Sequence, residues 1–337
     1  MSSALLVLTA LFAAAPATFD QSYRAGLVAL QANQLDVAEV NLRAAVQLQP
    51  KNARAWTALA QTYQREKQTQ KATQAAESAM RWGSDDSAVM QSLVVVYSGN
   101  GQMMEAASAQ ARYEALNPRD QIAAGRAALL YFEVARPLLQ QQKFAEALRV
   151  LETARSKVKT NPQIELALGV TDYGLRRFDE AAKAFLNVIT VDPSVEQPYL
   201  FLSKMLDSIP SQLPAVTARF AAFEAANPTD ARGYLLHAKA LNAQSLDAEK
   251  ARQLLAKSIA IDPTNPAAHT ELGTLLERMR AYPEAAVEFE RAAALDARDA
   301  ATHYHLARLY DRLNRPEDAA AQRLLHTQLS ANQEAIR

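Results

Sequence analysis

Residues that could do chemistry are few in this chain of 337 residues. Cysteine is absent, which excludes disulfides, thiolate metal sites and a cysteine nucleophile. His303 and His305 resemble a metal-binding pair, but two positions on a helix are about 200° apart, so the rings should point to opposite faces. The acidic pair Asp179-Glu180 falls where a helix should begin, and carboxylates there favour the positive end of the helix dipole. We predict no catalytic residue, no bound metal, no cofactor and no enzyme activity.

Sequence motifs add nothing to this short inventory. The chain contains no phosphate-binding glycine pattern, no H-E-x-x-H and no calcium-binding loop. Gly99-Asn100-Gly101 is typical of a turn between two helices. His269 and His303 lie 34 residues apart, at positions equivalent to Trp56, which favours packing over metal ligation.

The composition points to helices. Lys plus Arg and Asp plus Glu both number 36, so the chain lacks the excess of basic residues that marks a nucleic-acid binder. Hydrophobic residues make up 49% of the chain but aromatic residues only 7%, with nine glycines. An alanine-rich, glycine-poor and evenly charged chain predicts an all-helical protein with close helix contacts.

A period of 34 residues runs through the sequence. Ala38, Ala72 and Ala106 are spaced by 34, and so are Ala147 and Ala181. Such a period indicates a stack of similar supersecondary units, each too small to bury its apolar face alone.

The segment from Trp56 states the repeat most fully. Trp56, Leu59, Ala60 and Tyr63 are followed by small residues from Ala72 onward. This resembles the tetratricopeptide repeat, with its W-x2-L-G-x2-Y signature. About nine copies can be aligned, at residues 19–52, 53–86, 87–120, 128–161, 162–195, 196–230, 231–265, 266–299 and 300–333. The resemblance implies an all-α fold, a right-handed α-solenoid (superhelix) of stacked antiparallel helix pairs.

Helix ends are marked at the expected places. Five prolines should end second helices, because proline disfavours helical geometry in the residue before it: Pro50, Pro118, Pro193, Pro228 and Pro263. Six residues should cap the next first helix: Asn52, Asp86, Asn161, Asp230, Asn265 and Asp299. We therefore expect about eighteen helices and no sheet.

The period breaks most clearly after the third repeat, and smaller additions of one residue occur near Ile209-Pro210 and Ser245. Seven extra residues lie between Asp120 and Ala128, close to two helical turns, so a longer helix would keep its buried face. Pro137 then falls inside a helix that it should kink. We divide the chain into repeats 1–3 (18–120), an irregular extended repeat 4 (121–161), and repeats 5–9 with a C-terminal cap helix (162–337).

Residues 1–17 differ from the rest. An uncharged apolar run from Ala4 to Ala15 ends in small residues, although no Lys or Arg precedes it. Its length suits a signal peptide and is too short for a membrane anchor, so we predict no membrane span after its removal. Export to the periplasm or the medium would follow. The alternative is a helix that caps the first repeat of a cytoplasmic protein.

The resemblance also implies a binding surface. In such families the first helix of each repeat lines a concave groove that holds peptide or protein segments. By helical phase, positions 2, 5, 9, 12 and 13 of each repeat should face it. The candidate partner-binding residues are Tyr23, Arg54, Arg65, Phe132, Arg136, Tyr173, Lys204, Arg232, Lys239, Tyr304 and Arg308.

Basic residues outnumber acidic ones at these positions. We therefore expect a protein or peptide partner that is extended and acidic or carboxylate-terminated, bound by a non-enzymatic scaffold or adaptor. In the alternative, these charges are solvated or paired along each helix. A second alternative for the function is a regulatory or accessory subunit of an enzyme complex. No oligomeric state follows from the sequence.

Overall fold

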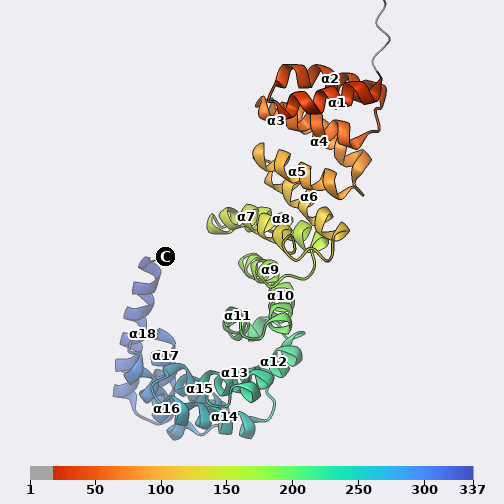
Figure 1. Cartoon of the computed structure of the whole chain (residues 1–337). Coiled ribbons are helices and arrows are strands. Elements are labelled where there is room, and N and C mark those ends of the chain that lie inside the picture. The colour runs from red at the N-terminus through yellow and green to blue at the C-terminus, as the bar shows by residue number, and fades with distance from the viewer. Residues whose placement is uncertain (1–17, 337) are drawn as a thin grey trace, which may run out of the picture. The chain divides into compact units, whose positions relative to one another are not determined.

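The computed structural model describes residues 18–336, and the side chains of residues 18–332. In that part of the chain there are eighteen α-helices, one short 3-10 helix and no strand (Figure 1). Successive helices form antiparallel pairs, which confirms the all-α fold and the nine helix pairs. None of the described helices combines the length and apolarity needed to cross a membrane.

The chain forms two compact units, which meet in sequence at Ile164 and Glu165. The helices up to that point are α1 (Phe19–Gln31), α2 (Leu35–Leu48), α3 (Ala53–Arg65), α4 (Thr69–Gly83), α5 (Ser87–Gly99), α6 (Met103–Leu116), α7 (Arg126–Gln140) and α8 (Phe144–Lys157). The later helices are α9 (Pro162–Gly174), α10 (Phe178–Val191), α11 (Gln197–Lys204), the 3-10 helix η1 (Leu206–Ser208), α12 (Leu213–Ala226), α13 (Ala231–Ala243), α14 (Ala248–Ile261), α15 (Pro266–Arg278), α16 (Tyr282–Leu295), α17 (Ala300–Arg312) and α18 (Pro316–Ile336).

Helix ends lie at the positions expected from the sequence. Second helices stop two residues before the predicted prolines, as at Leu48 before Pro50 and Ile261 before Pro263. All six predicted caps accept backbone N–H groups of the helix that follows: Asn52, Asp86, Asn161, Asp230, Asn265 and Asp299. These side chains satisfy donors that a helix leaves unpaired at its start.

Small residues let paired helices approach closely. A Cβ atom added at Gly169 would lie 2.5 Å from a ring atom of Phe185, and one at Gly273 would lie 2.8 Å from Phe289. Both phenylalanines are fully buried. Glycine in the first helix therefore makes room for a large ring from the second, as the repeat pattern predicts.

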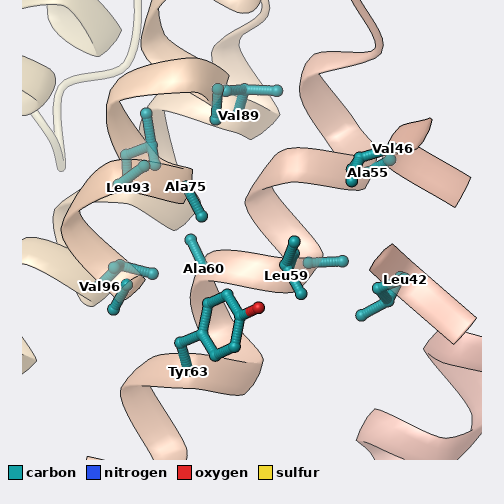
Figure 2. Packing of buried hydrophobic residues seen from close by; sticks show 14 of the residues in the cluster. Leu42, Val46, Ala55, Leu59, Ala60, Tyr63, Ala75, Val89, Leu93 and Val96 are labelled. Atoms are coloured by element: carbon teal, nitrogen blue, oxygen red, sulfur yellow. The ribbon is translucent and has the colours of Figure 1, made fainter. Parts of the chain in front are cut away.

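The core extends across successive repeats within each unit. In the first, Leu42, Leu59 and Leu93 from three successive repeats are buried in one cluster, with Ala75 of α4 between them (Figure 2). In the second unit the largest of the described clusters joins α10 to α13 around Phe220. Each repeat shares its apolar face with its neighbours, which is the way repeat proteins gain stability.

The inserted residues depart from our expectation. They do not lengthen a helix: residues 121–125 form turns, and α7 begins at Arg126. Gly125 precedes it with φ +83°, and Glu114 of α6 accepts the Gly125 and Ala127 N–H groups at 3.3 and 2.8 Å. A carboxylate from the preceding repeat thus takes the place of a local cap, so the insertion is absorbed as a loop. Pro137 lies inside α7, which continues to Gln140.

The N-terminal prediction lies outside the described residues, since these begin at Thr18. Thr18 closes a capping box with Gln21: the Thr18 hydroxyl accepts the Gln21 N–H at 3.3 Å, and the Gln21 side chain accepts the Thr18 N–H at 3.1 Å. The first repeat therefore starts with a complete cap made from its own residues.

Candidate protein-binding face

We call the surface formed by positions 2, 5, 9, 12 and 13 of the first helices the first-helix face. None of its nine ninth-position residues is buried: Leu27, Gln61, Val95, Arg136, Val170, Lys204, Lys239, Thr274 and Arg308. Each of these nine side chains is therefore at least partly accessible to solvent.

Most of the predicted basic residues on this face have partners. Arg136 pairs with Glu133 on its own helix at 2.6 Å. Arg54 binds Asp86, the residue that caps α5 of the next repeat, at 2.8 Å. Their charges are offset locally, so they offer less to an acidic ligand than the sequence count suggested.

Arg308 is also paired, and with another repeat. It lies 3.6 Å from Glu277 of α15, which also accepts a hydrogen bond from His305 at 2.9 Å. The guanidinium of Arg308 lies over the ring of Tyr304 at 5.5 Å. The alternative of paired charges thus holds here, but the pairs join neighbouring repeats as well as positions along one helix.

Arg65 has a structural contact. Its guanidinium donates to the carbonyl of Leu30, near the end of α1, at 2.9 Å. Arg278, at the same position of its repeat, donates to the carbonyl of Asn242 in α13 at 2.7 Å. In these two repeats the arginine at position 13 therefore satisfies a carbonyl at the end of the preceding first helix.

Arg232 lies between two carboxylates. It donates to Asp230 at 2.7 Å and to Glu196 at 2.9 Å. These hydrogen bonds, the one to Asp230 above all, raise the pKa of Arg232, and Arg232 holds the pKa of Asp230 below its usual range. The group of three carries one net negative charge, so the sign at this position is the reverse of the one expected from the sequence.

Lys204 and Lys239 differ from these arginines. No carboxylate in the described residues pairs with either ammonium group. Lys204 is exposed at the end of α11, whereas Lys239 is half-buried on α13. The two lysines are the predicted basic residues whose charge the described chain leaves available to a ligand.

The predicted aromatic residues lie in different surroundings. Tyr23 is half-buried and stacks on Phe19 with 5.4 Å between ring centres. Tyr173 packs edge-on against Phe201 at 5.2 Å, within the core cluster of the second unit. Phe132 is half-buried, and Tyr304 is exposed. Tyr304 is therefore the one of these four rings that is open to a partner.

A pocket of about 290 Å³ brings several of these features together in the second unit. Leu200 of α11, Leu235 of α13 and Phe223 of α12 give it an apolar lining. Lys239 lines it as well, and so does Arg232 with its partner Glu196. Leu200 is 54% exposed, so the pocket has an apolar side chain at its open surface. An apolar hollow with a few polar groups is the common form of a ligand site.

Two stretches of the sequence match known repeats. Residues 29–97 and residues 135–195 each match the pattern of the tetratricopeptide repeat family. The chain is a tetratricopeptide repeat protein. Proteins of this kind are typically scaffolds that bind other proteins.

Several solved structures resemble this chain in part. MamA (residues 41 to the end) from Desulfovibrio magneticus RS-1 is 24% identical, over 51% of this chain and 96% of its own, with a TM-score of 0.41. A thermophilic repeat protein from Thermus thermophilus is 21% identical over 51% of this chain and 98% of its own, also with a TM-score of 0.41. Yeast Tom70 is 13% identical over 92% of both chains, with a TM-score of 0.39. No curated protein matches the chain.

One recurring contact of the repeats escaped the sequence analysis. At position 4, a ring donates a hydrogen bond to the carbonyl six residues earlier, in the turn between repeats. The five pairs are Trp56 and Pro50, Tyr199 and Pro193, Tyr234 and Pro228, His269 and Pro263, and His303 and Ala297. The signal in the sequence was a ring with a hydrogen-bond donor (Trp, Tyr or His) at the fourth position of five repeats.

The histidines take part in this packing. His269 and His303 are buried, and their second ring nitrogens contact Glu288 at 2.7 Å and Gln322 at 2.7 Å. His305 instead stacks on Phe289, with ring centres 4.8 Å apart. In residues 18–332 no three histidine or carboxylate side chains gather as a metal site would need.

Proposed function

We propose that this tetratricopeptide repeat protein is a non-enzymatic scaffold that binds an extended segment of a partner protein on its first-helix face. The pocket between α11, α12 and α13 is the anchor of that site. The observation that carries the proposal is the exposure of Leu200 beside a pocket that also contains the unpaired ammonium of Lys239. A hollow lined by apolar side chains and a few polar groups is a common form of binding site.

The chemistry of the pocket suits a peptide chain. Leu200 and Leu235 offer apolar contact to one side chain, while Ser203 and Asn265 at the edge can bond to backbone groups. An extended segment satisfies such a site because its side chains alternate and its backbone stays available for hydrogen bonds.

A selection experiment tests this site. Random peptides displayed on phage are selected on the full chain, and the enriched peptides are measured by calorimetry on two variants. Leu200→Arg should abolish binding, because it places a charge in the apolar pocket. Leu246→Arg is the matched control, since Leu246 is 49% exposed in the loop before α14 and does not line the pocket. Peptides that bind both variants as well as the parent chain would refute the proposed site.

We also propose that the protein is exported after removal of residues 1–17. The support is the apolar run of the sequence, together with the capping box that opens the described structure at Thr18. Mass spectrometry of the protein from its native cell should find a mature chain that begins near Thr18. A chain that retains residues 1–17 would contradict export by this route.

A further inference from the structure

The pocket between α11 and α13 carries opposite charges at its two ends. At the start of α13, Arg232 is bound by Glu196, which lines the pocket, and by Asp230, which lies two residues before Arg232 and outside the lining. The three groups sum to one negative charge. Lys239 lies seven residues further along the same helix, with no paired carboxylate in the described chain. Seven helical residues correspond to about 10 Å of helix axis.

Apolar residues line the same pocket as these charged groups. Leu200, Leu235 and Phe223 line the same hollow as Glu196 and Lys239. An extended chain covers about 10 Å in three residues. A segment lying along α13 could therefore place one side chain in the hollow and have a charged side chain reach each end.

We propose that the pocket selects a dipolar segment: an apolar residue flanked by a basic residue on one side and an acidic residue on the other. The basic side chain lies beside Glu196 and Asp230, and the acidic side chain lies beside Lys239. The inference rests on the proposed binding site and narrows its partner. It also departs from the acidic partner that the sequence suggested, since an acidic segment would meet Glu196 and Asp230 with like charge.

Ion pairs at the edge of this pocket act over short distances. The side chains of Arg232 and Glu196 are 52% and 63% exposed, so each new ion pair at this rim is partly screened by water. Exposed ion pairs add only modestly to binding affinity, but like charges in contact also lower it. Specificity is the difference between the affinities for matched and mismatched peptides. Two pairs acting together correspond to a preference of roughly three- to tenfold.

Three peptides with blocked ends and the same central leucine test the proposal. The mixed peptide has Lys on one side of the leucine and Glu on the other, the second peptide has Glu on both sides, and the third has Lys on both sides. Affinities are measured by calorimetry on the full chain in low salt. The mixed peptide should bind roughly three- to tenfold more tightly than either of the others, and this advantage should shrink in high salt.

Charge-reversal variants then assign the two ends. Lys239→Glu should move the preference to the peptide with two Lys, and Glu196→Lys should move it to the peptide with two Glu. Lys239→Gln, which keeps size and removes charge, serves if the reversal at this half-buried position disturbs folding by circular dichroism, and it should abolish the preference for Glu. Lys250→Glu on α14 is the control, exposed and outside the pocket, and should keep the parent order.

Two failures are distinguishable. If no peptide binds more tightly to the parent chain than to Leu200→Arg, the binding site itself is wrong. If all three peptides bind the parent chain equally and lose affinity in Leu200→Arg, the site stands and the charge selection is overturned. An unchanged ranking in both Lys239→Glu and Glu196→Lys would overturn it as well.

Discussion

Helix α13 forms two interfaces with neighbouring first helices. The interface with α15 is closed by hydrogen bonds and is called the closed joint, whereas the interface with α11 contains the pocket. On the side of α15, Arg278 donates to the Asn242 carbonyl at 2.7 Å, to the Asn242 side chain and to Ser245 at 3.1 Å. Asn242 donates in turn to Glu271 at 2.6 Å. On the side of α11, position 13 of α13 is Ala243, which offers no such donor.

The helix on the open side is also shorter. α11 ends at Lys204 after eight residues and continues as the 3-10 helix η1, whereas α15 has thirteen. The pocket of about 290 Å³ lies mainly on this side, with Asn265 and Ala267 at the start of α15 completing its lining. Closure of a joint is thus decided by a few side chains at the helix ends, while the apolar frame of the repeats stays the same.

The largest expected difference in stability is between a phenylalanine packed under α15 and a phenylalanine in the wall of the pocket. Phe289 is fully buried under Gly273 of α15, so Phe289→Ala should lower the free energy of unfolding by about 3–5 kcal/mol. Phe223 is a half-buried wall of the pocket, and Phe223→Ala should cost about 1–2 kcal/mol. Urea unfolding followed by circular dichroism measures both. Equal losses would mean that the pocket wall is packed as tightly as the contact between α15 and α16.

The next contrast concerns the two basic residues. Arg278→Ala leaves the Asn242 carbonyl without this donor and should cost about 1–2 kcal/mol. Lys239→Ala removes no hydrogen bond or ion pair within the described chain and should change stability by less than about 0.5 kcal/mol while weakening the binding of the mixed peptide. Hydrogen exchange on α13 localises the first effect. A larger loss for Lys239→Ala would show that this lysine is structural.

The contact between α16 and α17 should also weaken at alkaline pH. Tyr310 of α17 donates to Glu290 of α16 at 2.7 Å, and burial, followed by this hydrogen bond, raises its pKa to about 12. Because the folded pKa lies above the unfolded value of about 10, the stabilisation is complete below pH 10 and is lost as the pH rises to about 12. Thermal melts across that window should fall less steeply for Tyr310→Phe than for the parent chain. Parallel curves would contradict the assignment.

The sequence predicted the positions of the helices better than the side-chain contacts between repeats. The 34-residue period, the prolines and the capping residues located the helices because these features act within one repeat. Pairing was missed because Arg232 with Glu196, and Arg65 with the Leu30 carbonyl, join residues 36 and 35 positions apart. Helical phase shows that a side chain faces solvent, but the partner that reaches it from the next repeat depends on packing.

The pocket could not be predicted for a similar reason. Leu200 and Leu235 occupy the same repeat position, yet one is 54% exposed and the other 8%. The helix that carries Leu200 ends early at Lys204, whereas the helix that carries Leu235 continues to Ala243. A pattern of residue types does not record that interruption, since Ile209-Pro210 reads as a one-residue addition to an ordinary repeat.

The smallest expected effect concerns the two tyrosines at position 4 of neighbouring repeats, and it separates a loss of stability from a loss of binding. Tyr199 and Tyr234 both donate to a proline carbonyl six residues earlier, at 3.1 and 2.9 Å, and both are buried. Replacing either with Phe keeps the ring and removes one hydrogen bond, so each change should cost about 0.5–1.5 kcal/mol in urea unfolding. Tyr199 lines the pocket and Tyr234 does not.

Binding should therefore respond only to Tyr199→Phe. The affinity of the mixed peptide is compared in the two variants by calorimetry, with Tyr234→Phe as the matched control of equal chemistry. If the local packing of Tyr199 shapes the pocket, its variant loses affinity while the control does not. Equal affinities would show that the turn hydrogen bond holds the joint without shaping the site, and the pocket would then be set by the shortened α11 alone.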